Sequence, residues 1–138
     1  MKLYRPISLT LVFLFAITGL LFIVIPDKVL ILFNHFSPSI GMPQSPVSGF
    51  SFYLILAAGY MYLVTILAFL MFRHPDNRQF PMLLAHAKLA SSVLSLILFL
   101  VQSHYLIYLA NFIIDGFIGL VVAYLYFKKP KARLWEFS

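Results

Sequence analysis

The sequence has no cysteine and only four acidic residues, and each shortage excludes a class of function. Without cysteine the chain has no disulfide, no thiol nucleophile and no thiolate metal site. Three of the four carboxylates, Asp27, Asp76 and Glu136, lie outside the long apolar runs, so no carboxylate pair for acid–base chemistry is expected within those runs. Charged residues make up 10% of the chain and hydrophobic residues 62%, which is too little charge to cover a soluble domain. We therefore expect a membrane protein.

Motifs for metal, cofactor or covalent chemistry are also missing. The sequence contains no HExxH, no glycine-rich phosphate loop and no usable Ser/His/Asp arrangement. Its histidines fall at the ends of apolar runs, where His35 and His104 belong to one side and His74 and His86 to the other. A bis-histidine haem within the bilayer is therefore not expected, and we predict neither a metal nor any other cofactor.

Four long apolar runs define the predicted fold. They cover residues 7–25, 50–72, 80–101 and 105–127, and each is long enough to cross a hydrocarbon core of about 30 Å as a helix. The first run lacks a small-residue cleavage site, so we expect an uncleaved span. The prediction is one membrane domain, 1–138, with an all-α integral membrane four-helix bundle in up-down-up-down order.

The segment between the first two runs, residues 26–49, is too mixed to span. Pro26 stops the first run, and residues 29–33 form an apolar stretch too short to cross a bilayer. We expect a short interfacial helix or lid here. The proline, glycine and serine residues that follow predict an irregular extracytoplasmic loop.

The positive charges indicate an orientation. With four spans, eight cations fall on the side that holds both termini, and only Lys28 falls on the other side: Lys2, Arg5, Arg73, Arg78, Lys128, Lys129, Lys131 and Arg133. The positive-inside rule therefore predicts cytoplasmic termini, with a basic cytoplasmic tail at 128–138. Because these cations flank spans, we expect contact with the lipid bilayer and no nucleic-acid partner. A bacterial inner membrane is the expected location.

Polar residues inside the last two runs share helical faces. In the third run, Lys88 is followed on one stripe by Ser91, Ser92, Ser95 and Gln102. In the fourth, Tyr108, Asn111 and Asp115 lie three and four residues apart. The turn 102–104 is minimal, so these two spans are expected to be antiparallel neighbours. Together with a deep tyrosine of the second run, the predicted intramembrane polar pocket comprises Asp115, Lys88, Asn111, Ser91, Ser95, Tyr60 and Tyr108.

Asp115 is the most informative of these residues. An ionised aspartate at mid-span costs at least about 2.5–3.5 kcal/mol, so it needs a partner or a proton. Three interpretations stay open. Lys88 and Asp115 form a structural ion pair, or Asp115 is held neutral while Lys88 reaches toward the cytoplasm, or Asp115 works on a proton, an ion or a polar headgroup.

Small residues indicate where helices approach closely. Ala57, Ala58 and Gly59 form such a cluster in the second run. Gly119 and Ala123 form a small-xxx-small pair in the fourth. Both groups are expected at helix–helix contacts.

These features favour a non-enzymatic function. We expect an accessory or scaffolding subunit of a larger membrane complex or homo-oligomer, or a binder of a lipid-like molecule in the polar pocket. A small proton- or cation-coupled carrier that uses Asp115 is the alternative. A membrane enzyme acting on an apolar substrate is the second alternative, and the sparse chemistry supports it least.

Overall fold

The computed structural model describes residues 3–47 and 51–128, with the side chains of 51–54 left aside. Lys2, the tail 129–138 and the side chain of Tyr53 therefore lie outside the described residues. The described elements, in chain order, are α1 (Tyr4–Val24), α2 (Pro26–Phe36), the 3-10 helix η1 (Ser37–Ile40), α3 (Ser51–Arg73), α4 (Gln79–Val101) and α5 (Leu106–Lys128). Helices α1, α3, α4 and α5 are long and apolar enough to cross a membrane. The predicted all-α four-helix bundle is confirmed.

Helix α2 is the short helix expected after the first span. Ile25 leaves the helical region, with φ −137° and ψ 51°, and ends α1. Pro26 then occupies the first turn of α2, where its missing N–H would have had no helical partner. The helix has 11 residues, so it is about 16 Å long and too short to span.

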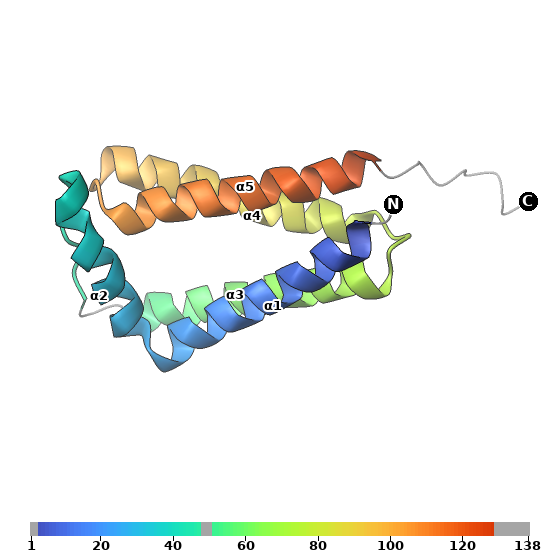
Figure 1. Cartoon of the computed structure of the whole chain (residues 1–138), viewed down its shortest axis with the longest axis horizontal. Helices are drawn as coiled ribbons and strands as arrows, with labels where there is room; N and C mark the ends of the chain where they lie inside the picture. The colour runs from blue at the N-terminus through green and yellow to red at the C-terminus, as the bar shows by residue number, and fades with distance from the viewer. Residues whose placement is uncertain (1–2, 48–50, 129–138) are drawn as a thin grey trace, which may run out of the picture.

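The four long helices associate as two pairs. Helix α1 packs along α3, α4 packs along α5, and the contact between α3 and α4 is shorter. Figure 1 shows the two pairs close together at the end that holds the N-terminus and farther apart at the end that holds α2. Helix α2 contacts both α1 and α5, so it bridges the two pairs at that end.

Glycines bring α5 against α4. A Cβ added at Gly119 would lie 2.8 Å from Leu89 Cδ2 and 3.2 Å from the Leu89 backbone nitrogen. One added at Gly116 would lie 2.8 Å from Ser92 Oγ. The close approach predicted at Gly119 is therefore confirmed. The prediction for Gly59 is wrong, because a Cβ there would meet nothing within 4 Å.

The side chain of Asn34 holds the loop after α2 through hydrogen bonds. Asn34 Nδ2 donates to Ser45 O at 2.8 Å, and Asn34 Oδ1 accepts from the Ser45 amide nitrogen at 2.8 Å. Gly41, with φ 70°, ends the 3-10 helix in the left-handed region that favours glycine. These contacts hold the described part of the loop, up to residue 47, against the end of α2.

Candidate intramembrane polar site

Lys88 of α4 and Asp115 of α5 form a buried ion pair. Lys88 Nζ lies 2.9 Å from Asp115 Oδ1, and the two side chains are 3% and 6% exposed. The two groups meet because α4 and α5 pack closely and because the lysine side chain is long. Of the three sequence-based interpretations, the geometry matches the first, in which the two residues are partners.

The Lys88 ammonium also contacts two aromatic rings. Its Nζ lies 4.4 Å from the ring centroid of Phe15 in α1 and 5.1 Å from that of Tyr60 in α3. Both distances are within cation–π range. Tyr60 is fixed in turn, because its hydroxyl donates to the carbonyl oxygen of Ala87 at 3.1 Å. One ammonium group therefore joins all four long helices.

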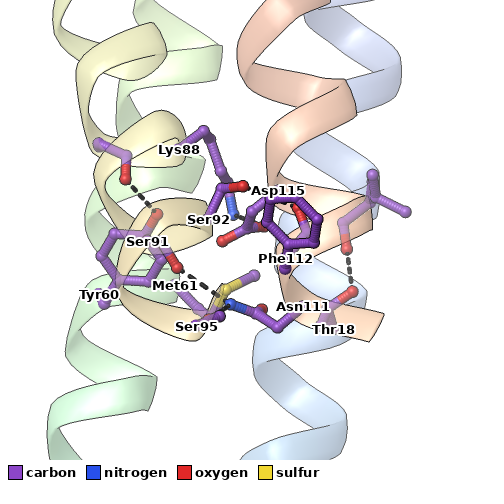
Figure 2. A network of polar contacts seen from close by, with 12 residues as sticks. Thr18, Tyr60, Met61, Lys88, Ser91, Ser92, Ser95, Asn111, Phe112 and Asp115 are labelled. Carbon is purple, nitrogen blue, oxygen red and sulfur yellow. Dashed lines mark hydrogen bonds and ion pairs between the residues drawn. The ribbon is translucent and has the colours of Figure 1, made fainter. Parts of the chain in front are cut away.

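The serine stripe and Asn111 form the second half of the site, shown between the helices in Figure 2. Asn111 Nδ2 donates to Ser91 Oγ at 3.2 Å and to Ser95 Oγ at 2.6 Å. Ser92 Oγ donates to the Phe112 carbonyl oxygen at 2.8 Å. Asn111 and Ser91 are half-buried, and no hydrogen bond among the described residues uses Asn111 Oδ1. That oxygen keeps its capacity to accept a hydrogen bond.

Most of the predicted pocket residues come together. The described contacts join them in two groups: the Lys88 ammonium contacts Asp115 and Tyr60, and Asn111 bonds to Ser91 and Ser95. Tyr108 is placed differently: its ring packs against Tyr105 with centroids 5.6 Å apart, and no described hydrogen bond joins it to the others.

The predicted pocket omitted two residues that the geometry includes. Ser92 lies on the predicted stripe, so its spacing from Lys88 was the available signal. Phe15 had no such signal, because a phenylalanine in an apolar run has the same pattern whether it faces lipid or a cation.

The polar groups of this site differ in how far they are engaged with one another. Asp115 and Lys88 form an ion pair with each other, and both side chains are buried. Among the described residues, no group of three or more His, Asp or Glu side chains could hold a metal ion. The Asn111 amide and the neighbouring hydroxyls are the polar groups left for a ligand.

Comparison with protein-family models, with curated proteins and with solved structures finds no match. The chain's function is therefore inferred from the chemistry of its own residues.

Proposed function

We propose that this small multi-pass membrane protein binds a lipid-like molecule between its two helix pairs, with the Asn111 amide holding the molecule's polar group. The observation that carries the proposal is the open acceptor, Asn111 Oδ1, on a half-buried side chain at the centre of the bundle. In a bilayer, a hydrogen-bonding group without a protein or water partner is costly. A ligand hydroxyl or amide would satisfy it.

The arrangement of the helices supports this assignment. Ser91, Ser95 and Asn111 lie on the α2 side of the Lys88–Asp115 pair, toward the end where the helix pairs diverge (Figure 1). The ion pair would then form the closed inner end of the binding region. Helix α2, which contacts α1 and α5, would act as its lid.

Two other functions draw less support. A carrier that uses Asp115 would need that carboxylate free to exchange a proton or cation, whereas it is bonded to Lys88 in this structure. An accessory subunit would fill the same hydrogen-bonding site with a polar group from another membrane protein. The experiment below separates this possibility from a lipid.

The test is ligand retention by the full chain purified in mild detergent. We expect mass spectrometry of the wild-type protein to detect a bound lipid-like molecule. Asn111→Leu should weaken its binding about tenfold, because losing a hydrogen bond at this half-buried site costs on the order of 1–1.5 kcal/mol. Thr65→Val is the matched control, since the Thr65 hydroxyl donates only within its own helix, to Met61 O.

Circular dichroism and thermal unfolding verify that both variants are folded. A wild-type protein without a retained small molecule would contradict the proposal, as would equal retention by Asn111→Leu. Recovery of another membrane protein, lost on Asn111→Leu, would overturn the lipid assignment in favour of the accessory subunit.

A further inference from the structure

A basic cavity lies at the opposite end of the bundle, beside the turn between α3 and α4. Its volume is about 510 Å³, and its walls include Arg5, Arg73, His74, Asp76, Asn77 and Phe80. A second cavity of about 340 Å³ shares Arg5, Arg73 and His74 with the first and adds Phe72. The three basic side chains therefore stand between two hollows, each of which has an aromatic wall.

Local structure fixes the position of this cavity. Arg5 is in the first turn of α1, and Arg73 is the last residue of α3. The His74 amide donates to Leu70 O at 2.8 Å and closes the end of α3. Asn77 Oδ1 accepts from the Gln79 amide at 2.9 Å, which holds the turn. Both arginines thus stand at the ends of spans, where the phosphates of a bilayer lie.

The nearby Arg78 differs from Arg5 and Arg73 because its guanidinium already has partners. Its guanidinium lies 4.5 Å from the Tyr126 ring centroid, and Nη2 donates to the Tyr126 carbonyl oxygen at 3.3 Å. Arg78 is therefore engaged with α5. Among the described residues, neither Arg5 nor Arg73 forms an ion pair, even though Asp76 lines the same cavity. These two guanidinium groups remain available to an anion.

The net charge of the residues that line the cavity indicates which ligand charge it would match. Two guanidinium charges less one carboxylate leave one net positive charge when His74 is neutral. A phosphodiester carries one negative charge, whereas a phosphomonoester carries nearly two. Arginine is the side chain best suited to bind a phosphate through paired hydrogen bonds.

We propose that this cavity binds the phosphodiester group of an anionic membrane lipid, with Arg5 and Arg73 on the phosphate and Phe80 beside the lipid's apolar part. The assignment uses other residues than the Asn111 site and stands independently of the function proposed above. Under this proposal, the end of the bundle that holds the α3–α4 turn binds one lipid at a defined site, rather than attracting anionic lipids nonspecifically.

The experiment is a lipid titration of the full chain in detergent, with bound lipids counted by native mass spectrometry. Phosphatidylglycerol should bind more tightly than phosphatidylcholine or phosphatidic acid. Arg5→Gln and Arg73→Gln should each weaken phosphatidylglycerol binding about tenfold, because each removes one charge-assisted contact. Lys128→Gln is the matched control: it removes one positive charge near the end of α5, where Lys128 lies over the Tyr124 ring. Its effect should stay below about twofold.

Three results would overturn the proposal. An equal effect of Lys128→Gln would show nonspecific charge attraction, and unchanged binding by both arginine variants would exclude the cavity. Glycerophosphoglycerol or inorganic phosphate that binds as tightly as phosphatidylglycerol would show that the lipid's apolar part contributes nothing and that the ligand is a soluble phosphate. If one arginine variant fails to fold, the other decides, because each alone tests the cavity.

Discussion

At the scale of single residues, a lysine ammonium inside a bilayer needs compensation on more than one side. Lys88 receives it from the Asp115 carboxylate and from the rings of Phe15 and Tyr60. Desolvating both charges costs several kcal/mol for each ion, so the pair is a weak source of net stability. Burying either charge without its partner destabilises the protein far more. We therefore infer that the pair fixes how the helices dock more than it adds net stability.

This reasoning gives a prediction for Lys88→Met. The substitution leaves Asp115 buried without its partner, so we expect a loss of about 3–5 kcal/mol in the free energy of unfolding. The double variant Lys88→Met/Asp115→Leu removes both charges and should return to within about 1 kcal/mol of the wild type. Unfolding in mixed micelles, followed by circular dichroism, measures both values.

Lys28→Met controls for the loss of a positive charge, because Lys28 is exposed. We expect it to change stability by less than about 0.5 kcal/mol. A double variant as unstable as the single one would contradict the structural interpretation. The carboxylate of Asp115 would then contribute to stability in a way that removing both charges does not restore.

At the scale of helices, the sequence predicts which helices form better than it predicts which helix faces touch. The four long helices could be predicted because uninterrupted apolar runs can be seen directly in the sequence. The Lys88–Asp115 contact remained one of three alternatives, because spacing gives each group's height along its helix but not the rotation of one helix against the other. The same limit explains why Gly59 and Gly119, both predicted at helix–helix contacts, have opposite environments.

Those two glycines form a matched pair for the next prediction. Gly119→Ala places a methyl group against Leu89, including its backbone nitrogen at 3.2 Å, so α4 and α5 must separate. We expect a loss of about 1–3 kcal/mol in the free energy of unfolding from this overpacking. Gly59→Ala meets open space and should leave stability unchanged or raise it by up to about 1 kcal/mol through helix propensity. Equal effects of the two substitutions would mean that the α4–α5 seam is looser than the structure shows.

At the scale of the whole molecule, charge is concentrated at one end. Arg5, Arg73, Arg78 and Lys128 belong to the end with the N-terminus and the α3–α4 turn, and Lys28 in α2 belongs to the other (Figure 1). By the positive-inside rule, we propose that the first end faces the cytoplasm. Helix α2 and the open side of the polar site would then face outward, so a lipid-like ligand would enter from the outer leaflet.

This orientation can be tested directly, because the natural sequence contains no cysteine. Ser39→Cys, at an exposed position of η1, should react with a membrane-impermeant maleimide on intact cells. Gln79→Cys, exposed at the start of α4, should react only after the membrane is permeabilised. The reverse pattern would invert the orientation and direct the Asn111 site to the cytoplasm. Partial labelling of both sites on intact cells would show two orientations, which the excess of positive charge at one end should prevent.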